Sequence, residues 1–266
     1  MSTSQMPHET SQSGPQGSPA QKADVGVLLI HGLNGSRHDL QALADLLAAE
    51  GMIAENMLLP GHGTSIRDLL RLGWPEWAAA VHSELRALKQ RCERVFLIGH
   101  SLGGALCLHI AAHEEVAGVV AMCPPLHMYT WIRIGVRLVR YLTPLLPTIR
   151  EDIHDPIGRR SHRREHYRWT ALAPVESMLQ YLPQLRGELP HVTAPALIMV
   201  SLHDHVVPAR DGRDIYRLLG SQEKHLVTFY RSYHVITKDY DREEVFAKTL
   251  AFIRRHAARP GGHFSS

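Results

Sequence analysis

Short apolar runs alternate with helix-like segments over most of this chain, and this order most constrains its fold. The runs are rich in valine, isoleucine and leucine, which is typical of strands buried on both faces of a sheet. The segments between them carry apolar residues at helical spacing. The expected strands are 26–30, 52–59, 95–98, 117–122, 196–201 and 225–230. Strict alternation predicts an α/β fold with a mostly parallel, doubly wound sheet and helices on both faces.

The alternation also predicts how the chain is divided. A length of 266 residues is compatible with a single α/β domain. Between residues 126 and 191 the alternation stops, and six prolines are expected to divide this insertion into short helices that form a cap. The core is then 23–125 together with 192–258. The terminal segments 1–22 and 259–266 contain few apolar residues, so we expect both to be disordered.

Composition and charge exclude several function classes. No segment reaches the ~18–20 consecutive apolar residues of a membrane span, and the N-terminus lacks the apolar region of a secretory signal. The three cysteines form no even disulfide framework, which favours reduced thiols and a cytoplasmic protein. The net charge is only +3, and the basic run 159–164 is expected to be a solvated helix face, so no nucleic-acid partner is predicted.

The amphipathic stretch 129–142 contains arginines beside apolar residues. This pattern leaves open a transient contact with an anionic lipid surface, although an ordinary cap helix is the preferred interpretation. The sequence gives no indication of the oligomeric state.

A glycine-rich turn follows the expected strand 95–98. Its residues are Gly99-His100-Ser101-Leu102-Gly103, a G-x-S-x-G pattern between a strand and a helix expected at 105–112. In such a turn the serine is strained and exposed, and the next amide is left unpaired at the helix N-terminus. An exposed nucleophile and an oxyanion donor are two requirements of acyl transfer. The alternative is a glycine-rich turn with an incidental serine.

Two further residues complete a predicted catalytic triad. Ser101, Asp204 and His234 each follow an expected strand, and the carboxyl ends of parallel strands share one sheet edge. Their order along the chain, Ser, Asp, His, is that of the α/β-hydrolase arrangement. The competing acids are expected to be helix caps or solvated, since they lie within or at the ends of expected helices; they are Asp211, Asp214 and Asp239.

The chain contains 19 histidines, of which His234 is the predicted catalytic base. His234 lies in the last strand-to-helix loop, where a base is needed. His100 is expected to point away from the open side of the serine turn. His109 and His113 share a helix face, but no third ligand is apparent, so no metal site is predicted.

No cofactor is expected either. Gly32 and Gly35 follow the first strand, but the G-x-G-x-x-G pattern of dinucleotide-binding folds does not occur there. The loop after the first strand should instead supply the second oxyanion donor. We therefore predict that the backbone N–H groups of Leu33 and Leu102 form the oxyanion hole.

The whole pattern resembles the serine carboxylesterases and monoacylglycerol lipases of the α/β-hydrolase superfamily, with the closest likeness to small-cap bacterial carboxylesterases. The resemblance covers roughly 25–125 and 195–257, and it implies the same triad and oxyanion roles. Those esterases often have an aromatic residue where Leu33 stands, and the cap matches no pattern. The motifs are His31-Gly32-Leu33-Asn34-Gly35, Leu59-Pro60-Gly61-His62-Gly63, Gly99 to Gly104, Asp204-His205-Val206-Val207-Pro208 and Ser232-Tyr233-His234-Val235-Ile236-Thr237.

These observations predict a serine ester hydrolase with a small-molecule ester substrate. It would cleave carboxylic esters through an acyl-enzyme. Apolar cap residues, Leu126, Trp131 and Leu145, predict a hydrophobic pocket for a short- to medium-chain acyl group. Two alternatives stay open: a monoacylglycerol or lysophospholipid lipase, and a non-catalytic ligand-binding module that keeps the fold.

Overall fold

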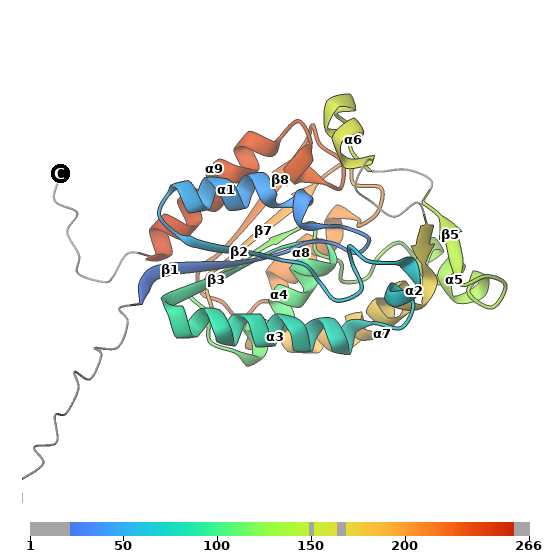
Figure 1. Ribbon diagram of the computed structural model, residues 1–266, viewed down its shortest axis with the longest axis horizontal. Coiled ribbons are helices and arrows are strands. Elements are labelled where there is room, and N and C mark those ends of the chain that lie inside the picture. The colour runs from blue at the N-terminus through green and yellow to red at the C-terminus, as the bar shows by residue number, and fades with distance from the viewer. Residues whose placement is uncertain (1–21, 149–151, 164–168, 258–266) are drawn as a thin grey trace, which may run out of the picture.

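A parallel sheet forms the centre of the molecule in the computed structural model, which describes residues 22–148, 152–163 and 169–257 (Figure 1). Its strand order is β2-β1-β3-β4-β7-β8, and every neighbouring pair is parallel. The strands are β1 (Ala23–Ile30), β2 (Ile53–Met57), β3 (Cys92–His100), β4 (Gly118–Met122), β7 (Ala196–Ser201) and β8 (Lys224–Phe229). Each of them overlaps a strand expected from the sequence, so the α/β prediction is confirmed.

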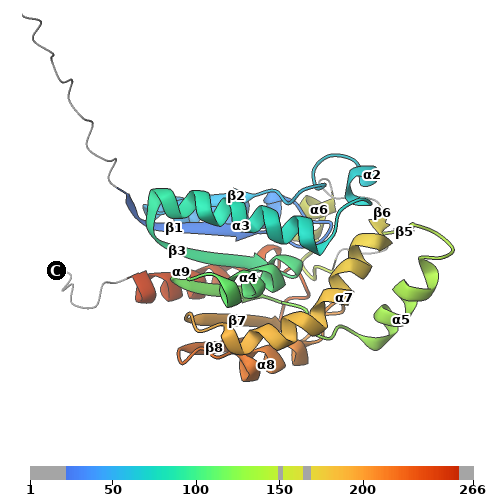
Figure 2. The same cartoon turned by 90° about the horizontal axis from the view of Figure 1, so that it is seen from below.

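Helices cover both faces of the sheet (Figures 1 and 2). One face packs against α1 (Gln41–Ala49) and α9 (Arg242–Ala257). The other packs against α3 (Trp74–Arg91), α4 (Leu102–His113), α7 (Leu172–Glu188) and α8 (Ala209–Leu218). Short helical segments lie in the connections: η1 (Arg37–Asp39), α2 (Ile66–Leu69), η2 (Leu189–His191) and η3 (Ile236–Lys238).

The two faces explain why the strands are apolar throughout. In β1, Val27 and Leu29 join the cluster beneath α1 and α9, whereas Leu28 and Ile30 join the cluster beneath α3 and α4. Successive side chains of a strand point to opposite faces, so a sheet covered on both sides needs apolar residues at every position. Burying a side chain of this size contributes about 1.5–3 kcal/mol.

The segment 126–191 contributes α5 (Thr130–Val139), β5 (Leu145–Pro147), α6 (Pro156–Arg163), β6 (Trp169–Ala171) and α7. Strands β5 and β6 form a separate antiparallel pair. This pair, α5 and α6 lie at the end of the molecule where the sheet strands terminate (Figure 2). The two predicted disordered tails lie outside the described residues, apart from Lys22.

The expectation that prolines would divide this whole segment into short helices is wrong for α7. This helix has 17 residues and contains Pro174 and Pro183. Pro174 lies in the first turn, where a backbone N–H has no intrahelical acceptor in any case. Pro183 lies on the exposed face, while Leu182 and Leu185 are buried in the core beneath it. Packing of that buried face therefore outweighs one missing hydrogen bond.

Gly103 allows α4 to approach β1, and this contact yields a testable prediction. A Cβ at this position would lie 2.1 Å from the carbonyl oxygen of Ile30, which is backbone and cannot rotate away. Gly103→Ala should therefore lower the free energy of unfolding by about 1–3 kcal/mol or more. The matched control is Gly135→Ala in α5, where a Cβ would have no heavy atom within 4 Å; it should stabilise by about 0.4–1 kcal/mol. Urea unfolding measures both, and equal effects would contradict the prediction.

Candidate active site

Ser101 lies on the sharp turn between β3 and α4. Its backbone has φ 53° and ψ −118°, a conformation that residues other than glycine rarely adopt. Its N–H donates to the carbonyl of Met122 (2.8 Å), which fixes the turn against β4. A Cβ on Gly99 would lie 2.1 Å from the carbonyl oxygen of Gly103, so the turn needs glycine at position 99. Strain of this kind persists only when the surroundings hold it, and it is frequent at active sites.

Asp204 and His234 form a buried hydrogen-bonded pair. The Nδ1 atom of His234 lies 2.6 Å from Oδ2 of Asp204, and the two residues are 7% and 4% exposed. The other carboxylate oxygen, Oδ1, accepts the N–H groups of Val206 (2.8 Å) and Val207 (2.7 Å). A carboxylate only accepts hydrogen bonds, so Nδ1 carries the proton and Nε2 keeps its lone pair. This is the tautomer that a general base requires.

The surroundings of His234 favour its protonated form. Burial lowers the pKa of this imidazole, but the charge and hydrogen bond of Asp204 raise it, and Asp152 raises it further; the net direction is upward. A base with a raised pKa takes up a proton more readily. It must nevertheless be neutral before each turnover, so activity is expected to fall as the pH decreases through this pKa.

Ser101 and His234 both line a cavity of about 630 Å³. Its apolar part is formed by Met128, Trp131, Ile132, Val136, Leu146, Leu172, Val175 and Met178. Polar side chains also reach it, among them Asn34, Asp152, Thr170 and His205. The cavity is thus concave and largely apolar with a few polar groups, which is typical of sites for small molecules.

The predicted oxyanion donors flank the serine. Leu33 lies in the loop after β1 and lines the cavity. Leu102 is the first residue of α4, and N–H groups of a first helical turn have no intrahelical acceptor. Leu102 as a whole is fully buried, so its part in the oxyanion hole stays a prediction.

Of the three predicted pocket residues, only Trp131 lines the cavity, and it is 68% exposed. Leu126 is instead buried in the main core, held by the donation of its N–H to Asp211 (2.9 Å). Leu145 packs at the edge of that core, while its neighbour Leu146 lines the cavity. Leu126 and Leu145 thus do not line this cavity, because hydropathy does not show which side of the insertion faces the serine.

The competing acids have structural tasks. Asp211 is fully buried and accepts three N–H groups, those of Leu126, His127 and Met128. Asp239 is also buried and accepts N–H groups from two separate loops. The expectation that they would be solvated or simple helix caps is wrong for these two; each holds a loop after a strand. Asp214 is partly exposed and pairs with Arg217 (3.5 Å).

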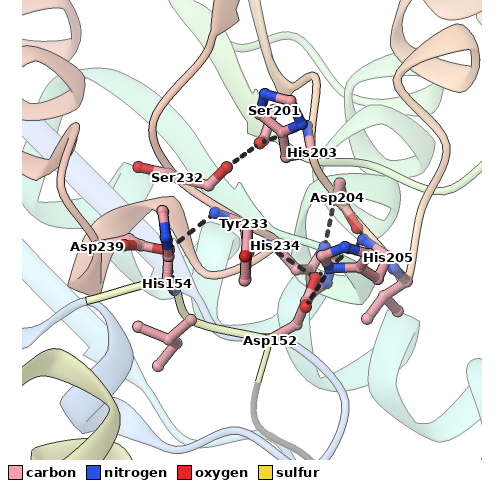
Figure 3. Close-up of polar contacts among 12 residues, drawn as sticks. Asp152, His154, Ser201, His203, Asp204, His205, Ser232, Tyr233, His234 and Asp239 are labelled. Atoms are coloured by element: carbon pink, nitrogen blue, oxygen red, sulfur yellow. Dashed lines mark hydrogen bonds and ion pairs between the residues drawn. The ribbon is translucent and has the colours of Figure 1, made fainter. Parts of the chain in front are cut away.

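The expectation that His100 points away from the open side of the serine turn is wrong. His100 lines the cavity, and its Nε2–H donates to the carbonyl of His234 (3.0 Å). Burial and the nearby His234 lower its pKa to about 4, so it is neutral near pH 7. His100 thus supports the loop of His234. Asp152, which lies beside His205 and His234 (Figure 3), was not predicted, since nothing in the sequence of the insertion marks it as close to the sheet edge.

The histidine pair on α4 has a third neighbour, contrary to expectation. Nδ1 of His109 lies 2.8 Å from Glu188, and Nε2 of His113 lies 3.4 Å from it. The hydroxyl of Tyr181 donates to the same carboxylate (2.7 Å). Glu188 comes from the far end of α7, so sequence spacing could not reveal it. These side chains already form a hydrogen-bonded network that fastens α7 to α4.

Comparison with known proteins shows what this chain is similar to. A family model described as serine aminopeptidase, S33 matches residues 21–241. A thermostable monoacylglycerol lipase from Bacillus sp. (strain H-257) is 33% identical over 246 residues, which cover 92% of this chain and 96% of that protein. A carboxylesterase from Bacillus subtilis (strain 168) is 24% identical over 239 residues and covers 87% of this chain and 93% of its own.

Solved structures show the same fold. A structure from a study of two metagenome-derived lipolytic enzymes, LipS and LipT, has a TM-score of 0.81 and 32% identity, covering 88% of this chain and 95% of that one. The monoacylglycerol lipase of Paleococcus ferrophilus has a TM-score of 0.71 and 22% identity, with coverage of 87% and 94%. The predicted resemblance to esterases and lipases, and the prediction of a hydrolytic enzyme, are confirmed. The chain belongs to the serine aminopeptidase S33 family of α/β-hydrolases.

Proposed function

We propose that this chain is a serine ester hydrolase that cleaves short- to medium-chain carboxylic esters with Ser101, His234 and Asp204 as its triad. One observation carries the proposal: Ser101 on its strained turn and His234, which is hydrogen-bonded to Asp204, line one largely apolar cavity. The family relatives named carboxylesterase and monoacylglycerol lipase support the same chemistry.

The reaction then follows from the assigned tautomer. Nε2 of His234 accepts the proton of Ser101 while Oγ attacks the ester carbonyl, and Asp204 stabilises the resulting imidazolium. The N–H groups of Leu33 and Leu102 receive the oxyanion. Collapse of the tetrahedral intermediate expels the alcohol, which takes the proton from His234. Water, deprotonated by the same imidazole, then attacks the acyl-enzyme, and His234 returns that proton to Oγ of Ser101 as the acid is released.

A monoacylglycerol lipase is the second candidate. The relative that is 33% identical over nearly its whole length bears that name, and the cavity combines an apolar wall with polar groups that suit a hydroxylated alcohol. The side chains of Trp131, Ile134 and Leu138 on α5 are exposed, which supports transient contact with a lipid surface.

A substrate panel tests the proposal. We expect kcat/KM for p-nitrophenyl esters to rise from acetyl to medium chains, since each buried CH₂ contributes about 0.8 kcal/mol, and to fall once the cavity is filled. A higher kcat/KM for micellar monoacylglycerols than for monomeric esters would favour the lipase. No hydrolysis above the background of Ser101→Ala at any chain length would overturn the enzyme and leave the ligand-binding alternative.

We further propose a cytoplasmic location and no nucleic-acid partner. Cys92, Cys107 and Cys123 are all free and buried, as suits a reducing compartment. Among the described helices, none has the length and apolar character needed to cross a membrane. In the described part of the basic run, residues 159–162, His162 is buried beside Asp39 (3.2 Å).

A further inference from the structure

Asp152 comes from the insertion, yet its carboxylate lies between the loops that carry Asp204 and His234 (Figure 3). Its Oδ2 accepts the N–H groups of His205 (2.9 Å) and His234 (3.2 Å). Its Oδ1 lies 2.7 Å from Nδ1 of His205. Asp152 is 8% exposed and lines the cavity. One buried carboxylate therefore holds two loops that are far apart in the sequence.

The neighbouring residues of the insertion strengthen this attachment. The N–H of Val235 donates to the carbonyl of Asp152 (3.1 Å). The N–H of His154 donates to Asp239 (2.7 Å), and its ring stacks on Tyr233 with centroids 4.6 Å apart. The segment 152–155 is thus fastened along the loop of His234, so the carboxylate has little freedom to move away.

The charge of Asp152 raises the pKa of His234. Two neighbours are uncharged near pH 7: burial lowers the pKa of His100 to about 4, and burial raises the pKa of the Cys123 thiol well above its ordinary value. Asp204 contacts the ring of His234, whereas Asp152 accepts the backbone N–H of that residue and also contacts His205. Among the described residues, the titratable groups near His234 include Asp152 of the insertion, His100 at the end of β3, Cys123 after β4, and Asp204 and His205 after β7.

We propose that Asp152 is a positioning residue of the active site, which holds His234 in line with Ser101 and fixes the ring of His205 at the cavity wall. This inference rests on the proposed function, because it assigns a task within that same triad. It also gives the insertion a part in catalysis besides covering the cavity: the insertion supplies a carboxylate that accepts the backbone N–H of the base.

Asp152→Asn tests this inference through the pH profile. Because Asp152 raises the pKa of His234, loss of its charge lowers that pKa, so His234 stays neutral at lower pH. The acid limb of kcat/KM should therefore move to lower pH. A residue that only supported the fold would lower activity without moving this limb. The amide oxygen of asparagine can replace Oδ2 and still accept both N–H groups, so kcat should fall less than in Asp152→Ala. For Asp152→Ala, misplacement of the base predicts about a 100-fold loss of kcat with little change in KM.

The matched control is Asp155→Asn, three residues further along. Its carboxylate caps α6 by accepting the N–H groups of Ile157 and Gly158, a task that asparagine also performs, so the acid limb and kcat should stay unchanged. An unmoved acid limb in folded Asp152→Asn would overturn the inference, as would an acid limb that vanishes in His205→Gln, since it would then belong to His205. Absence of ester hydrolysis in the wild type would instead refute the proposed function itself.

Discussion

Replacing Ser101 by alanine should lower kcat for p-nitrophenyl esters by about a million-fold, the size of effect known when a triad serine is lost. His234 and Asp204 cannot compensate, because the acyl-enzyme needs an oxygen on residue 101 to carry the acyl group. The fold should survive, since only Oγ is removed and the described hydrogen bond of Ser101 to Met122 comes from its backbone. Steady-state kinetics and the midpoint of thermal unfolding measure the two halves of this prediction.

Covalent labelling provides the control. A fluorophosphonate should add one group to the wild-type chain and none to Ser101→Ala, as mass spectrometry would show. Ser83→Ala, on the exposed side of α3, changes a serine far from the cavity and should label and turn over like the wild type. Labelling that persists in Ser101→Ala would place the nucleophile elsewhere and remove the basis of the proposed mechanism.

Local sequence patterns were sufficient to predict the sheet. They also predicted which loops carry the three proposed triad residues. Apolar runs such as Ala196–Ser201 identify buried strands, and the carboxyl ends of parallel strands meet at one edge. Residues that directly follow such strands, as Ser101 does, therefore come close without any knowledge of side-chain contacts. The same rule distinguished Asp204 from Asp211, which comes later in the chain, inside α8.

The insertion follows no such rule, so its contribution to the site could not be foreseen. Asp152 reaches the loop of His234 only through tertiary contacts made 82 residues apart. Leu145 and Leu146 are both apolar, yet only Leu146 lines the cavity, a difference set by how β5 pairs with β6. Helix α7 continues through Pro183 because its buried face packs on the core. In each case tertiary packing determines the observed structure, and local sequence propensity does not predict it.

Asp204→Asn should lower kcat by about 10⁴-fold while the fold stays intact. Asparagine can keep its oxygen on the N–H groups of Val206 and Val207, so its NH₂ group then faces His234. An NH₂ group donates, so Nδ1 must become the acceptor and the ring proton moves to Nε2. His234 would then hold its lone pair away from Ser101 and could no longer accept the serine proton.

The comparison that isolates this effect is Asp214→Asn, a partly exposed carboxylate on α8 paired with Arg217. It loses the same charge at a surface site, and exposed pairs contribute only about 0–1 kcal/mol, so its kcat should equal that of the wild type. Alkaline pH should partly restore Asp204→Asn if hydroxide can replace the missing base in deacylation, whereas a misfolded site would not respond. Wild-type turnover by Asp204→Asn would show that another group orients His234, with Asp152 as the next carboxylate to change.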